Sequence, residues 1–173
     1  MTTGAATVEH EGARGGARPL VEVRGISKRF GGVQALDGVS VAIQAGSVHG
    51  LVGENGAGKS TLAKVIGGVY RPDEGELLVD GRQLSFNAPR DALETGIATI
   101  AQEIALVPAR TVLENVMLGI ESNTAGVLRS RELRHRFDEL NEQTGFRLDA
   151  QAVVRTLRTA DQQKVEILRA IAR

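Results

Sequence analysis

The sequence GENGAGKST, residues Gly53 to Thr61, is the feature that most constrains how this chain can fold. It fits the pattern G-x-x-x-x-G-K-[ST], in which glycines let backbone N–H groups converge on phosphate oxygens. Such a loop works only where an apolar strand runs into it and a helix follows it, because the positive end of the helix adds to the attraction. The pattern therefore predicts an α/β fold.

The residues on either side of the loop have the required patterns. Ser47 to Val52, SVHGLV, is an apolar run that predicts a short buried strand. After the loop, Leu62, Val65, Ile66 and Val69 recur at helical spacing and share one face. A chance glycine-rich turn is the alternative, but it explains neither the strand before the loop nor the helix after it.

Within the loop, each residue type has a separate electrostatic role. Lys59 is predicted to reach the terminal phosphates of a nucleotide, and the Ser60 hydroxyl to ligate a bridging Mg²⁺. The remaining residues contribute backbone N–H groups or conformational freedom. The predicted nucleotide-binding residues are Gly53, Glu54, Asn55, Gly56, Ala57, Gly58, Lys59, Ser60 and Thr61.

Period-two alternation before the loop, in residues 20–24 and 39–43, predicts two antiparallel strands at a sheet edge. A third strand is predicted at Glu76 to Asp80, because Asp80-Gly81 is a strong hairpin signal. A short helix is expected from Pro89 to Thr95. The apolar run from Ile97 to Ala101 predicts a buried parallel strand.

Beyond Pro108 the pattern becomes helical. Thr111 and Glu114 form a predicted capping box, in which a Ser or Thr and a Glu or Gln three residues later cap each other's backbone N–H groups. Thr159 and Gln162 predict a second such box. No strand pattern follows the last helix, so we expect the sequence to end inside an α/β domain.

Composition narrows the function classes. The 173 residues contain 21 Lys and Arg and 21 Asp and Glu, so no overall field favours nucleic acid as a partner. The chain has no cysteine, which excludes disulfides and favours a reducing cytoplasmic location. Residues 1–18 are predicted to be a disordered leader. No apolar run approaches the ~20 residues of a membrane span, so another chain would have to cross the membrane.

Three stretches of this sequence resemble the ATP-binding subunits of ABC transporters. They are GISKRFGGVQALDGVS, GLVGENGAGKSTLAKVIGGVYRPDEGE and QEIALVPARTVLENVMLG, and they follow that family's order and spacing. The loop variant and its distance from Gln102 most resemble the monosaccharide importers of the ribose, xylose and galactose type. The resemblance extends from about Val21 to Arg173.

The resemblance gives meaning to residues outside the loop. Phe30 matches the aromatic on which family members stack adenine, although a lone Phe after a strand is more often a core residue. Gln102 matches the glutamine thought to contact Mg²⁺ and the attacking water and to link to the membrane subunit, although a single Gln is usually only solvated. Residues Leu157 to Gln162, LRTADQ, stand where the family signature reads Leu-Ser-x-Gly-x-Gln, with Arg158 and Ala160 as departures.

The fold that the resemblance implies is an α/β, P-loop NTPase, ABC-type nucleotide-binding domain with an antiparallel β edge. Residues 19–173 would form a C-terminally incomplete ATP-binding domain, with a small helical subdomain at about 108–173. The family's catalytic Asp-Glu strand and switch histidine have no match in residues 1–173. We therefore expect this chain to bind Mg-ATP better than it hydrolyses it.

The resemblance also implies a function and partners. The chain would energise carbohydrate import as a peripheral protein on the cytoplasmic face of the membrane. Its partners would be a transmembrane permease, a second ATP-binding domain and, indirectly, an extracellular sugar-binding protein. Three alternatives stay open: a nucleotide-binding module without catalysis, a truncated product without independent function, and another loop-bearing enzyme such as a small-molecule kinase or GTPase.

Overall fold

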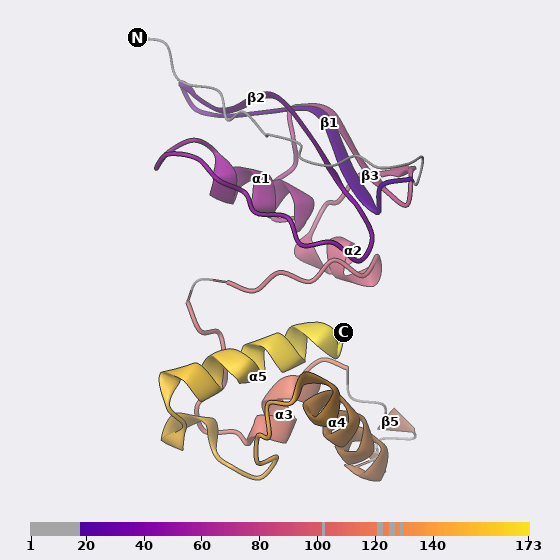
Figure 1. Cartoon of the computed structure of the whole chain (residues 1–173), viewed down its shortest axis with the longest axis vertical. Coiled ribbons are helices and arrows are strands. Elements are labelled where there is room, and N and C mark those ends of the chain that lie inside the picture. The colour runs from indigo at the N-terminus through magenta and orange to yellow at the C-terminus, as the bar shows by residue number, and fades with distance from the viewer. Residues whose placement is uncertain (1–17, 102, 121–122, 125–126, 129) are drawn as a thin grey trace. The chain divides into compact units, whose positions relative to one another are not determined.

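The computed structural model describes residues 18–101, 103–120, 123–124, 127–128 and 130–173. The predicted leader, residues 1–18, lies outside this part except for Arg18. The chain divides into two compact units at the Ile97–Ala98 bond, drawn together in Figure 1.

The first unit is built on a four-stranded antiparallel sheet. Its strands are β1 (Val21–Phe30), β2 (Val33–Ile43), β3 (Glu74–Val79) and β4 (Arg82–Leu84), in the order β2-β1-β3-β4. The antiparallel pairing predicted for residues 20–24 and 39–43 is confirmed, because β1 and β2 pair along most of their length. Of the predicted site residues, Phe30 lies on this sheet, at the end of β1.

The turn between β3 and β4 is the predicted Asp-Gly hairpin. Asp80 and Gly81 both have positive φ angles, 47° and 59°. Two consecutive left-handed residues match the right-handed twist of the flanking strands, which explains the preference for Asp-Gly in such a turn.

Helix α1 (Lys59–Ile66) lies against one face of the sheet (Figure 1). Its buried residues Leu62 and Val65 join a core that contains Ile26 of β1 and Leu36 of β2. Val69 lies beyond the helix and is 47% exposed, so its predicted place on the buried face is wrong. The short helix α2 (Pro89–Glu94) forms as predicted, and Ala92 completes the same core.

The two predicted buried strands do not form. Residues 47–52 and 97–101 belong to no strand, and Val48, Val52 and Ile100 are exposed at 101%, 83% and 49%. A buried strand is stable only when neighbours take up its N–H and C=O groups. Within the described residues, no segment pairs with either run, so apolar composition alone does not make them strands.

The second unit is mainly helical. It contains α3 (Val112–Met117), α4 (Ser130–Thr144) and α5 (Thr159–Ile171), with a 3-10 turn at Val154–Thr156. A two-residue ladder joins β5 (Asn123–Thr124) to β6 (Val127–Leu128). Among the described residues, no helix in either unit is long and apolar enough to cross a membrane.

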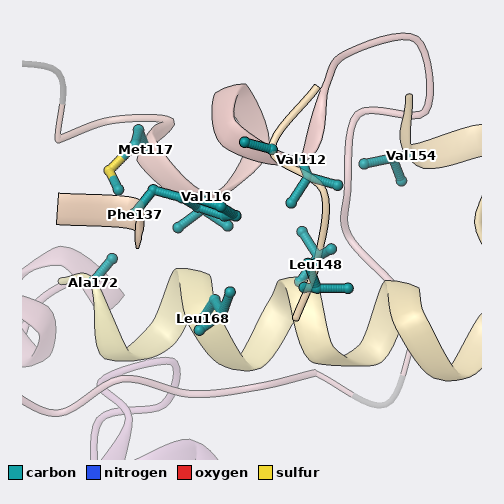
Figure 2. Close-up of a cluster of buried hydrophobic side chains, with 10 residues drawn as sticks. Val112, Val116, Met117, Phe137, Leu148, Val154, Leu168 and Ala172 are labelled. Carbon is teal, nitrogen blue, oxygen red and sulfur yellow. The ribbon is translucent and has the colours of Figure 1, made fainter. Parts of the chain in front are cut away.

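The core of the second unit forms where the three helices meet (Figure 2). Phe137 of α4 is fully buried and points toward Val116 and Met117 of α3, while Leu168 of α5 reaches the same cluster. Each helix buries its apolar face against the other two, which is the usual source of stability for helices this short. The full cluster comprises Val112, Val116, Met117, Phe137, Leu148, Ala150, Val154, Val165, Leu168 and Ala172.

The two predicted capping boxes have different outcomes. In α3, the Thr111 hydroxyl accepts a hydrogen bond from the Glu114 N–H at 3.2 Å, and the Glu114 carboxylate accepts one from the Thr111 N–H at 2.8 Å. The box at α5 is absent, because Thr159 is already the first helical residue. The Gln162 amide instead donates to the carbonyls of Val154 and Leu157 at 3.2 and 3.1 Å.

Candidate functional site

The glycine-rich loop is shaped by two glycines with left-handed backbones. Gly56 and Gly58 have φ angles of 87° and 85°, and Gly58 is the N-cap of α1. A Cβ atom at Gly58 would lie 2.5 Å from the carbonyl oxygen of Ala35 and 2.7 Å from the Leu36 side chain. Only glycine fits there, because β2 passes directly behind the loop.

The Lys59 side chain folds back onto the loop that precedes it. Its ammonium donates to the carbonyl oxygens of Gly53 and Glu54, each at 2.7 Å. The Ala57 N–H also donates to the Glu54 carbonyl, at 3.1 Å. A lysine at a helix start is unfavourable next to the positive end of the dipole, so these carbonyl contacts hold the charge inside the loop.

The start of α1 is suited to an anion. No side chain caps it, and its first turn contains no acidic residue. The first N–H groups of a helix have no partner within the helix, so phosphate oxygens could accept their hydrogen bonds. Ser60 lies exposed in this first turn. Its hydroxyl fits a hard cation that takes most of its other ligands from phosphate and water, as Mg²⁺ does.

Phe30 ends β1 in the same unit as the loop and is 40% exposed. Its ring meets that of Tyr70 edge to face, with centroids 5.0 Å apart and planes at 66°. The Lys28 ammonium lies 5.6 Å from the Phe30 centroid. This exposure differs from that of a core Phe, and Tyr70 is a neighbour that sequence reasoning did not identify.

Gln102 lies outside the described residues, but the segment after it is held by two buried polar side chains. The Glu166 carboxylate accepts from the Ala105 N–H at 2.7 Å, and the Asn115 amide oxygen accepts from the Val107 N–H at 2.7 Å. Neither residue was predicted from the sequence. Their signal was a polar side chain among the apolar positions of α5 and α3.

The signature-like segment opens α5 in the second unit. The Arg158 side chain is 93% exposed and lies 3.8 Å from Asp161, which accepts a 2.8 Å hydrogen bond from Lys164. That hydrogen bond, with the nearby positive charges, holds the pKa of Asp161 below its usual value. The helix therefore begins with an ionised carboxylate, and the departures Arg158 and Ala160 both lie exposed at its start.

The family model of ABC transporters matches residues 36–173, which is most of the chain. The chain belongs to the ABC transporter family. Its fold is the ABC-type P-loop nucleotide-binding domain, with the antiparallel sheet and helices expected from the sequence. This match decides against an unrelated kinase or GTPase.

Curated relatives of this ABC transporter chain are named as sugar importers. The ribose import ATP-binding protein RbsA 1 of Rubrobacter xylanophilus is 49% identical over 154 residues, covering 89% of this chain and 31% of the relative. The arabinose import ATP-binding protein AraG of Burkholderia pseudomallei is 49% identical over 148 residues, covering 86% of this chain and 29% of the relative. This chain thus spans about three tenths of these relatives' length.

A solved ATP-binding cassette shows the same fold. It was captured as a dimer in a post-hydrolysis state with ADP and Pi, and is 29% identical to this chain with a TM-score of 0.69. The match covers 88% of this chain and 69% of the cassette.

Proposed function

We propose that this chain binds Mg-ATP through the loop at Gly53 to Thr61 and supplies ATP-binding capacity to a sugar importer. The observation that carries the proposal is the start of α1. There the helix has no side-chain cap, and Gly58 stands where a Cβ atom would clash with β2. The Lys59 ammonium donates hydrogen bonds to carbonyl oxygens of the loop.

Phosphate binding would exchange partners within this loop. The Lys59 ammonium now bonds two neutral carbonyl oxygens, of Gly53 and Glu54. A bond to an ionised phosphate oxygen is stronger than one to a neutral carbonyl, so the ammonium gains by turning toward the nucleotide. Ser60 would hold Mg²⁺, which neutralises charge on the phosphates when bound. Phe30, with its part-exposed ring, would stack the adenine.

The wider assembly is part of the same proposal. The relatives' names support monosaccharide import, and the dimeric cassette supports pairing with a second ATP-binding domain. The chain would then act at the cytoplasmic face of a membrane, beneath a transmembrane permease that receives sugar from an extracellular binding protein. Gln102 would contact Mg²⁺ and the attacking water.

Calorimetric titration of Mg-ATP tests the proposal. Removing one charge-assisted partner with Lys59→Ala should weaken binding about ten-fold to a hundred-fold. The matched control is Arg90→Ala, which removes one positive charge from an 85% exposed side chain on α2. Equal affinity in the wild type and Lys59→Ala would overturn the assignment, whereas loss in both variants would indicate only a general charge effect.

A further inference from the structure

Four side chains form a continuous contact line around the proposed adenine position. Lys28 lies 5.6 Å from the Phe30 centroid, the Phe30 and Tyr70 rings are 5.0 Å apart, and Lys64 lies 5.4 Å from the Tyr70 centroid. Each cation is within the ~6 Å over which an ammonium is attracted to an aromatic face. The line joins β1 to the end of α1.

Hydrogen bonds hold both ends of this line. The Tyr70 N–H donates to the Lys64 carbonyl at 3.1 Å, which ties the Tyr70 backbone to the last turn of α1. At the other end, Asp73 accepts 2.7 Å hydrogen bonds from the Lys28 ammonium and the Arg29 N–H. The Lys28 hydrogen bond, followed by that from the Arg29 backbone, holds the pKa of Asp73 below its usual value. Phe30, by contrast, lies next to a turn of two glycines.

We propose that Tyr70 is a positioning residue that orients the Phe30 ring for adenine, an inference that rests on the proposed function. Phe30 is followed by Gly31 and Gly32, which supply no side chain to hold its ring. The edge-to-face contact with Tyr70 restricts the ring to one plane before the base arrives. Binding then requires less ordering of the side chain, and preorganisation of this kind raises affinity.

The proposal predicts a specific thermodynamic pattern. Tyr70 acts through Phe30, so its removal should weaken ATP and leave tripolyphosphate, which has no base, unchanged. Tyr70→Ala should weaken ATP about three-fold to ten-fold, the worth of an aromatic pair. Tyr70→Phe keeps the ring edge and should restore binding. Phe30→Ala should cost about ten-fold through lost stacking.

A double-mutant cycle of Phe30→Ala and Tyr70→Ala in the whole chain tests whether Tyr70 acts through Phe30. Because one residue acts through the other, Tyr70→Ala should cost almost nothing further once Phe30 is Ala. Full additivity would show that Tyr70 contributes independently and would overturn the proposal. Equal weakening of ATP and tripolyphosphate by Tyr70→Ala would also overturn it, because that result marks a general loss of structure.

A second readout uses the wild type and needs no folded Tyr70 variant. Tyr70 is the only tyrosine in the sequence, which has no tryptophan, so intrinsic emission excited at wavelengths longer than those that phenylalanine absorbs comes from this residue alone. When Tyr70 is excited on the long-wavelength side of the adenine absorption band, its emission should change with ATP and not with tripolyphosphate. The change should be lost in Phe30→Ala. An unchanged emission on saturation with ATP would contradict the proposal.

The two proposals fail separately. If the wild type and Lys59→Ala bind ATP alike, the phosphate-loop function is wrong, and with it the adenine position for which Tyr70 would orient the Phe30 ring. If Lys59→Ala weakens ATP while Tyr70→Ala does not, the function stands and the positioning role of Tyr70 is wrong.

Discussion

Helices α1 and α5 both begin without a side-chain cap, yet their first turns have opposite electrostatic character. The N-cap of α1 is a glycine, and no acidic residue follows in its first turn. The N-cap of α5 is Arg158, and Asp161 lies in its first turn. In α5 the Arg158 carbonyl accepts hydrogen bonds from the N–H groups of both Asp161 and Gln162, at 2.9 and 3.0 Å.

The difference shows that an uncapped helix start is not by itself an anion site. In α5, the Asp161 carboxylate already complements the positive end of the dipole and is itself paired with Lys164. In α1, the dipole has no carboxylate partner in its first turn, and the Lys59 ammonium adds positive charge beside it. The two starts therefore differ in what they can bind more than in how they fold.

The largest expected effect comes from the glycine that shapes the start of α1. Gly58→Ala should destabilise the chain by about 3 kcal/mol or more, because it adds a clash with β2 to the left-handed backbone penalty. Gly46→Ala is the matched control, since Gly46 has φ 67° with nothing within 4 Å of its would-be Cβ. It should cost only about 1 kcal/mol.

Urea unfolding measures both free energies, and ATP titration should show binding lost only in Gly58→Ala. Equal destabilisation by the two substitutions would mean that the loop moves away from Ala35 without cost. The start of α1 would then be no more constrained than an ordinary turn.

Two sequence signals that act within a few residues were reliable guides to this structure. The Asp80-Gly81 turn and the Thr111–Glu114 box form because each needs only its own neighbours. Ser47 to Val52 misled because a buried strand depends on partners elsewhere in the chain, and the described residues supply none. At Thr159 the box motif was present, but the Gln162 amide reaches the carbonyls of the preceding 3-10 turn instead.

The residues of the candidate site also differ in whether local sequence could predict them. Gly58 and Lys59 were predictable because the motif encodes local backbone geometry and charge. Tyr70 was not, because its contact with Phe30 joins residues that are 40 positions apart, and no spacing rule connects them. Glu166 was hidden for the same reason, since its partner Ala105 is 61 positions away.

A pair of threonines tests whether the starts of α3 and α5 differ in side-chain capping. Thr111→Ala removes a hydroxyl that caps the N–H of Glu114, so it should cost about 1 kcal/mol of unfolding free energy. Thr159→Ala should be neutral or stabilising by up to a few tenths of a kcal/mol, because no side chain caps α5 and alanine is the better helix former. Chemical denaturation of both variants gives the comparison directly. A loss of about 1 kcal/mol at Thr159 would restore the capping box that its sequence suggests.

The smallest expected effect is the pH dependence that Asp161 gives to α5. Its pKa is lowered in the folded chain, chiefly by the Lys164 hydrogen bond, so its stabilising contribution is present above the ordinary value of 3.8. That contribution is lost as the pH falls below 3.8 through the lowered folded pKa. Asp161→Asn should therefore be slightly less stable than the wild type at neutral pH, by less than Thr111→Ala, because the Asp161 side chain is still 24% exposed and solvent screens its charge. The difference should shrink toward zero on acidification. Unfolding free energies of the wild type and Asp161→Asn at a series of pH values measure it, and the lowered pKa of Asp73 cancels because both chains contain it. A difference that stays constant down to the acid limit would show that Asp161 stabilises α5 by something other than its charge, and the electrostatic contrast between the two helix starts would lose its main support.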